Sequence, residues 1–99
     1  MDELRFEWDS EKAGSNLRKH GVSFETAVRV FSDPFALTEQ DRIEGGEYRW
    51  QTIGLVDGAL VLLVAHADTE EHGIEMIRII SARRATTRER RRYAENRSI

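Results

Sequence analysis

Side chains that could bind an anion gather in the last quarter of the sequence. Residues 77–96 read IRIISARRATTRERRRYAEN, a strand-like run around Arg78 followed at once by an arginine-dense segment. Arginine stays protonated in proteins, and its planar fork of donors matches phosphate and carboxylate oxygens. The segment is therefore expected to face an anion, which could be RNA, DNA or an acidic partner protein.

Charge is distributed unevenly along the chain. Residues 1–75 hold 7 Lys/Arg and 16 Asp/Glu, a balance of −9, whereas residues 76–99 hold 8 Arg and 2 Glu, a balance of +6. Such asymmetry is typical of a nucleic-acid surface or a site for an acidic partner, although ion pairs along a solvated helix also produce it. The use of arginine without lysine in residues 76–99 favours bidentate recognition of phosphate or carboxylate.

Arg78 admits two interpretations. An arginine in the middle of a buried strand is costly unless it is paired, so Arg78 requires either an internal carboxylate or an open anion site. The sequence pattern favours neither. Ideal strand geometry also places Arg78 and Arg83 on opposite faces, so both can bind one phosphate only if a bulge or the strand end re-aims one of them.

Several classes of site and location are excluded by what the sequence lacks. It has no cysteine, no HxxxH, HExxH or clustered aspartates, and no Gly-rich phosphate loop, so no metal and no cofactor is expected. The longest apolar run, Ala59 to Ala65, is too short to span a bilayer, and the first residues do not resemble a signal peptide. A cytoplasmic protein without membrane contact is therefore expected.

The elements that must position these side chains follow from apolar periodicity and turn residues. Strands are predicted at 6–8, 35–38, 48–54, 59–66 and 75–83, and helices at 12–20, 23–32 and 86–96. The order is β-α-α-β-β-β-β-α. Consecutive strands joined by short turns predict an α+β fold, an antiparallel meander with helices packed on one face. Residues 1–99 are expected to form a single domain, because no linker or repeat divides them.

Four motifs, in this order, resemble the BrnT family of toxins from type II toxin–antitoxin pairs: FEWDSEKAGSNLRKHGVSFETAVRVFSDP, RWQTIG, LLVAH and IRIISARRATTRERRRYAEN. The resemblance covers about residues 6–96, with Ser10 standing where the family often has proline. It implies a fold similar to the RelE ribonucleases and RNA cleavage that stops translation. It also implies a ribbon-helix-helix antitoxin, through which the complex would bind DNA and repress its own operon.

Metal-independent RNA cleavage needs a cation for the developing charge and groups that move protons at the 2′-OH and the 5′ oxygen. We hypothesise that Arg78 and Arg83 hold the scissile phosphate and that His66 transfers a proton, with His20 and Tyr93 as alternatives. Side chains expected to bind the RNA backbone are Lys19, Ser81, Arg84, Arg88, Arg91 and Arg92. The resemblance itself assigns no individual role to these residues.

Two other functions explain the same residues. The basic C-terminal helix could belong to a non-catalytic module that binds nucleic acid or a partner protein. Alternatively, the domain could be inert, with its arginines paired internally. RNA cleavage in the presence of EDTA separates the enzyme from both.

Overall fold

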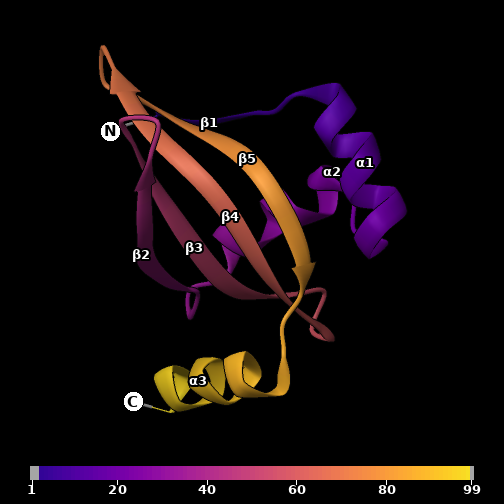
Figure 1. The fold of residues 1–99 in the computed structure, drawn as a ribbon. Helices are drawn as coiled ribbons and strands as arrows, with labels where there is room; N and C mark the ends of the chain where they lie inside the picture. Colours follow the sequence, from indigo (N-terminus) through magenta and orange to yellow (C-terminus); the bar gives the residue numbers. More distant parts are fainter. Residues whose placement is uncertain (1–2, 99) are drawn as a thin grey trace.

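Five strands form one mixed sheet in the order β1-β5-β4-β3-β2, with helices on either side of it (Figure 1). The computed structural model describes residues 3–98, so the expected domain ends at residues 1 and 99 lie outside this range. In chain order the elements are β1 (Glu3–Glu7), α1 (Ser10–His20), α2 (Phe24–Ala27), the 3-10 helix η1 (Val28–Ser32), β2 (Leu37–Glu44), β3 (Glu47–Val56), β4 (Leu60–Glu71), β5 (Ile74–Arg84) and α3 (Thr87–Arg97). Within residues 3–98, no helix is long and apolar enough to cross a membrane.

The predicted α+β class and order of elements are confirmed. Strands β2 to β5 form the expected antiparallel meander. Strand β1 differs, because it pairs with β5 in parallel, from Glu3 opposite Ile74 to Glu7 opposite Arg78. Parallel neighbours need a long connection rather than a turn, and here the whole chain between β1 and β5 intervenes.

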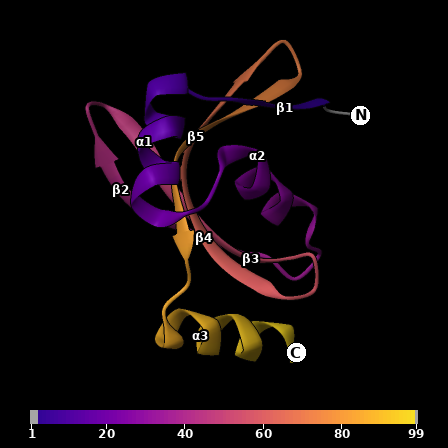
Figure 2. The same ribbon diagram turned by 90° about the vertical axis from the view of Figure 1, so that its right-hand side faces the viewer.

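One face of the sheet is covered by α1, α2 and η1 (Figure 2). Phe24 and Val30 pack there against Leu62, Val64 and Ile79 of β4 and β5. Buried Asn16 of α1 fixes the helix to β5, since its side chain accepts from the Ala82 N–H and donates to the Ala82 carbonyl. These contacts set the position of α1 alongside β5.

Helix α3 packs on the opposite face, which differs from the expectation that all helices share one face. Its Tyr93, with Ala85 ahead of it, contacts Ile53 of β3 and Leu63 of β4. Both faces of this end of the sheet are therefore buried. The face on which α3 packs continues beyond this helix, and we call that uncovered part the open face. It carries Arg42, Arg49, Gln51, Ala65, Ala67, Arg78 and Ser81.

Two element boundaries differ from the sequence prediction. The predicted helix at 23–32 is divided into α2 and η1, and η1 passes directly over β3. A Cβ at Gly54 would lie 2.9 Å from the Val30 Cβ, so this close approach requires glycine. The predicted strand at 35–38 instead begins at Leu37 and continues to Glu44, because it pairs with β3 along its length.

The β2–β3 hairpin turns through Gly45 and Gly46, whose φ angles are +60° and +78°. A two-residue turn with both central φ angles positive suits glycine and matches the twist of the flanking strands. It sets the register so that Glu44 lies opposite Glu47 and Arg42 opposite Arg49.

Candidate functional site

A register shift in β5 brings the two predicted phosphate-binding arginines onto one face. Ala65 lies opposite Ser81 and His66 opposite Ile79, so Ile80 is an extra residue in β5. As a result, Arg78 is opposite Ala67 and Arg83 is opposite Leu63, two positions on the same face of β4. Ser81 lies between them, opposite Ala65. Ideal strand geometry allows Arg78 and Arg83 to bind one phosphate only if a bulge or the strand end re-aims one of them. The structure has such a bulge in β5.

Three arginines form a row across the open face. Arg42 is opposite Arg49, Arg49 is opposite Ala67, and Ala67 is opposite Arg78. Directly opposed residues share a face, so the three side chains lie on one face of the sheet. Arg42 and Arg49 are on adjacent strands, about 4.8 Å apart, and β4 separates Arg49 from Arg78. We call Arg42, Arg49 and Arg78 the arginine row. Sequence reasoning missed Arg42 and Arg49, although the Gly-Gly turn would have paired them.

Glu47 lies within the arginine row. Its Oε1 accepts a hydrogen bond from Arg78 Nη2 at 2.5 Å and is 3.5 Å from Arg49 Nε. The small side chain of Ala67 allows this contact between β3 and β5, which β4 separates. The hydrogen bond to Arg78 holds the pKa of Glu47 below its ordinary value, and the charges of Arg78, Arg49 and Lys12 act in the same direction. The site therefore places the ionised Glu47 carboxylate between two of the cations, Arg49 and Arg78.

Arg83 makes a different ion pair, with Glu89 of α3. Its two terminal nitrogens lie 2.8 and 3.0 Å from the two Glu89 carboxylate oxygens. Glu89 also accepts from the Thr86 N–H and so completes the capping box of α3. The hydrogen bond to Arg83 lowers the pKa of Glu89 to about 2. This arrangement fixes the start of α3 to β5, so Arg83 is less available to a phosphate than Arg78.

His66 lies on the other face of the sheet, as the predicted grouping with Leu62 and Val64 requires. Its ring is 1% exposed and packs edge-on against Phe31. Nδ1 is 2.6 Å from Asp68 Oδ1, and Nε2 is 2.7 Å from Thr52 Oγ1. Thr52 in turn is 2.8 Å from the Thr38 hydroxyl. His66 is a sheet neighbour of β5, as expected, but its imidazole and the Arg78 guanidinium cannot reach the same phosphate.

Tyr93 is buried and attaches α3 to the rest of the fold. Its hydroxyl donates to Asp33 Oδ2 at 2.6 Å, and the same oxygen accepts from the Leu55 N–H at 2.8 Å. Burial and the bond to Asp33 raise the pKa of Tyr93 to about 12. A phenol that is 4% exposed and already donates its proton is poorly suited to exchange protons with RNA. In the structure the Tyr93 hydroxyl therefore makes a contact within the fold, between α3 and the segment before β2.

The remaining predicted residues are spread over two regions. Lys19 and His20 lie in the last turn of α1, exposed and half-buried respectively. Arg92 of α3 is ion-paired with Glu39 of β2. The side chains of Arg84, Arg88 and Arg91 are exposed and make no hydrogen bond or ion pair within residues 3–98. The basic tail therefore includes both internally paired and available arginines.

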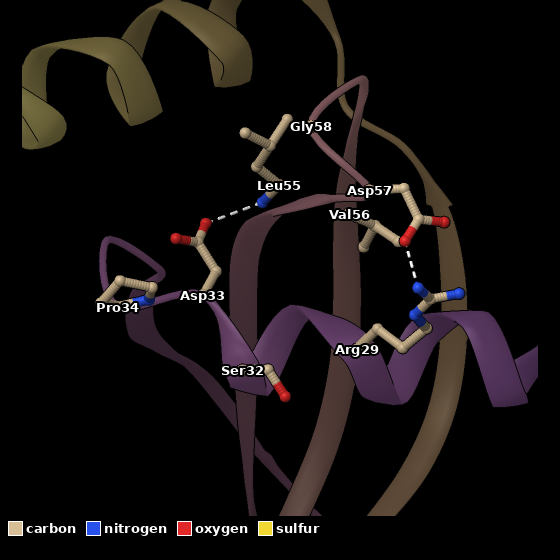
Figure 3. Close-up of a pocket in the computed structure, with 8 residues that line it drawn as sticks. All are labelled: Arg29, Ser32, Asp33, Pro34, Leu55, Val56, Asp57 and Gly58. Carbon is tan, nitrogen blue, oxygen red and sulfur yellow. Dashed lines mark hydrogen bonds and ion pairs between the residues drawn. The ribbon is translucent and has the colours of Figure 1, made fainter.

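A surface pocket of about 440 Å³ lies away from these residues (Figure 3). Arg29 and Asp57 form an ion pair at one side of it, and Asp33 accepts from the Leu55 N–H at the other. Its charged groups are already paired. The described residues contain no group of three or more His, Asp or Glu side chains arranged to hold a metal ion.

Comparison with known proteins identifies the family. The profile described as "Ribonuclease toxin, BrnT, of type II toxin-antitoxin system" matches residues 8–89. No curated protein matches the chain. The fold is similar to the 1.1 Å crystal structure of the Brucella abortus ribonuclease toxin BrnT, with a TM-score of 0.64 and 22% identity over 85% of this chain and 99% of that one. The chain belongs to the BrnT family of ribonuclease toxins of type II toxin–antitoxin systems.

Proposed function

We propose that this protein is an endoribonuclease toxin that cleaves RNA in the cytoplasm without a metal ion and so inhibits translation. The 2′-OH attacks the adjacent phosphorus, the 5′ oxygen leaves, and the products carry a 2′,3′-cyclic phosphate and a 5′-OH. The observation that carries the proposal is the arginine row on the open face. Closely spaced guanidinium groups bind the RNA backbone and stabilise the charge that develops on the phosphate.

Arg78 is the group proposed to hold the scissile phosphate. It lies in the motif IRIISARRATTRERRRYAEN shared with the family, and its side chain is 40% exposed, compared with 21% for Arg49. Arg78 has the internal carboxylate partner that one interpretation required, since it is paired with Glu47, and its exposed part leaves it accessible to the phosphate of the other interpretation. An incoming phosphate would compete with that carboxylate for the guanidinium.

A direct test compares Arg78→Ala with Arg29→Ala on a defined RNA in buffer containing EDTA. Loss of one group that stabilises transition-state charge typically lowers kcat about 10²- to 10³-fold. Arg29 is a suitable control, since it is another exposed, ion-paired arginine but lies on η1, away from the row. If Arg78→Ala cleaves the RNA in EDTA as fast as the wild type does, Arg78 does not hold the scissile phosphate. Absence of cleavage by the wild type, on free RNA and on translated mRNA alike, would reject the enzyme.

The partner proposed for the toxin is a ribbon-helix-helix antitoxin that neutralises it and links the complex to operator DNA. Membership of a type II toxin–antitoxin family supports the existence of a protein antitoxin. Co-expression with the adjacent gene is expected to restore growth and to yield a stable complex that binds the operon's promoter DNA. Continued growth arrest in the presence of that gene product would contradict this part of the proposal.

A non-catalytic role is the second candidate, and one observation favours it. Arg84, Arg88 and Arg91 are exposed and unpaired within residues 3–98, whereas Arg78 and Arg83 are paired with carboxylates. Such a surface could bind nucleic acid or the antitoxin without chemistry. RNA binding by the wild-type protein without any cleavage would support this alternative.

A further inference from the structure

The proposed reaction needs a group that accepts the 2′-OH proton, and the predicted proton-transfer residues lie elsewhere. His66 is buried on the other face with both ring nitrogens engaged. Tyr93 already donates its hydroxyl to Asp33. His20 lies one turn beyond Asn16, which binds β5 at Ala82, so α1 carries it away from Arg78. A proton acceptor therefore has to be sought among the side chains that contact the arginine row.

Glu47 is the carboxylate that contacts Arg78 and Arg49 of this row, whereas Glu44 contacts Arg42. Its Oε1 is 2.5 Å from Arg78 Nη2 and 3.5 Å from Arg49 Nε. Its side chain is 31% exposed, so a ribose at the site can reach it. Glu7 is the other carboxylate near Arg78, but it lies opposite Arg78 on the edge strand β1, outside the space between the arginines. The position of Glu47 beside the predicted phosphate-binding group is not indicated by any sequence motif.

We propose that Glu47 is the general base of the RNA cleavage reaction, an inference that rests on the proposed ribonuclease function. The Glu47 carboxylate accepts the 2′-OH proton as the 2′ oxygen forms its bond to phosphorus. The bond from phosphorus to the 5′ oxygen breaks, and that oxygen takes a proton from solvent. Arg78 stabilises the charge on the phosphoryl oxygens. Glu47 then returns its proton to solvent, so protons and electrons balance over the cycle.

The ion pairs of the free protein suggest how Glu47 becomes available. In the absence of RNA, Glu47 occupies Arg78 as an anion, in the position that a phosphate oxygen would take. When a phosphate displaces it, Arg49 remains to hold the carboxylate. The Arg49 Nε is buried and has no hydrogen-bond acceptor within the described residues, so a small movement of Glu47 would satisfy it. The positive charge of Arg49 also acts to lower the pKa of Glu47, so the displaced carboxylate stays ionised near neutral pH, as a base must be.

The test is the isosteric substitution Glu47→Gln, measured by single-turnover cleavage at saturating RNA. Loss of a general base is expected to lower kcat about 10²- to 10⁴-fold. RNA binding should be retained or become tighter, because a negative charge beside Arg78 and Arg49 is removed. The residual activity should increase about tenfold per pH unit, since hydroxide then takes the proton, whereas the wild type should be nearly independent of pH between about 6 and 8. Glu47→Asp, which keeps the carboxylate, should recover part of the rate.

Glu44→Gln is the matched control. Glu44 lies opposite Glu47 on the same hairpin and is also ion-paired with an arginine, Arg42. It is outside the contact with Arg78, so its substitution should leave kcat within about twofold. Thermal unfolding of each variant establishes that the protein is folded under assay conditions.

The outcomes separate this inference from the proposed function. If Arg78→Ala abolishes cleavage but Glu47→Gln keeps the wild-type kcat, the ribonuclease stands and Glu47 is not its base. A higher kcat in Glu47→Gln would mean that the carboxylate only competes with RNA for Arg78, which also overturns the inference. If the wild type cleaves no RNA, the proposed function fails and this inference fails with it.

Discussion

The hydrogen-bonded chain Thr38–Thr52–His66–Asp68 leads to a prediction that distinguishes a structural from a catalytic histidine. A carboxylate can only accept, so Nδ1 of His66 donates a hydrogen bond to Asp68, and Nε2 shares a hydrogen bond with the Thr52 hydroxyl. Thr52 is completely buried, whereas Thr38 is exposed on β2. The chain joins three strands on the face that α1, α2 and η1 cover. This hydrogen-bonded chain gives both ring nitrogens of the buried His66 a partner.

Thr52→Val removes the hydroxyl at the centre of this chain and preserves the shape of the side chain. Nε2 of His66, in a ring 1% exposed, then has no partner. Leaving a buried polar group unsatisfied costs about 1–3 kcal/mol. Taking about 2 kcal/mol, Tm should fall by about 8–16 °C, since a domain of this size shifts about 4–8 °C per kcal/mol. Thr38→Ala is the control: it removes a hydroxyl that water can replace, and its effect on stability should stay below about 1 kcal/mol.

Calorimetry or thermal circular dichroism measures the loss of stability, and RNA cleavage well below Tm measures function. Because His66 and Arg78 lie on opposite faces, folded Thr52→Val and His66→Gln proteins should retain kcat within about threefold. A tenfold or greater loss of kcat in both folded variants would refute this reasoning and support the sequence-based hypothesis that His66 transfers a proton. An unchanged Tm in Thr52→Val would show that the chain does not stabilise the fold.

Two further predictions concern α3 and the exposed arginines. The folded pKa of Glu89, about 2, lies below its unfolded value of about 4.5, so its ion pair with Arg83 stabilises the fold fully above about pH 5 and progressively less as the pH falls toward 2. Allowing for the 37% exposure of Arg83, this pair should lose about 1 kcal/mol between pH 6 and pH 3, and urea unfolding should show that additional loss in the wild type relative to Glu89→Gln. Replacing Arg84, Arg88 and Arg91 together by alanine should reduce the slope of log affinity against log salt for single-stranded RNA by about 2, with kcat at saturation unchanged. An unaltered slope would exclude these three side chains as backbone contacts.

Several features of the fold could be predicted from local patterns. The Thr86 capping box, the Asp57-Gly58 turn and the stop at Gly21 depend on residues close in sequence, and each lies at an observed element end. The face of the sheet on which α3 packs was harder to predict from the sequence, although one sequence feature indicated it. The apolar run from Ala59 to Ala65 indicates a strand buried on both faces, which requires a helix on each side.

The sequence by itself determined the class of fold, the order of elements, the family and the position of the basic segment, because these follow from local periodicity and contiguous motifs. It also predicted a phosphate-binding role for Arg78, which stays a prediction. Only the tertiary structure decided which face each side chain occupies and which carboxylate meets which arginine. The bulge at Ile80 reverses the facing of every later residue in β5, and the contact between Arg78 and Glu47 joins residues 31 positions apart. Strand pairing over such distances depends on the packing of the whole chain, so no local pattern could place the imidazole and the guanidinium on opposite faces.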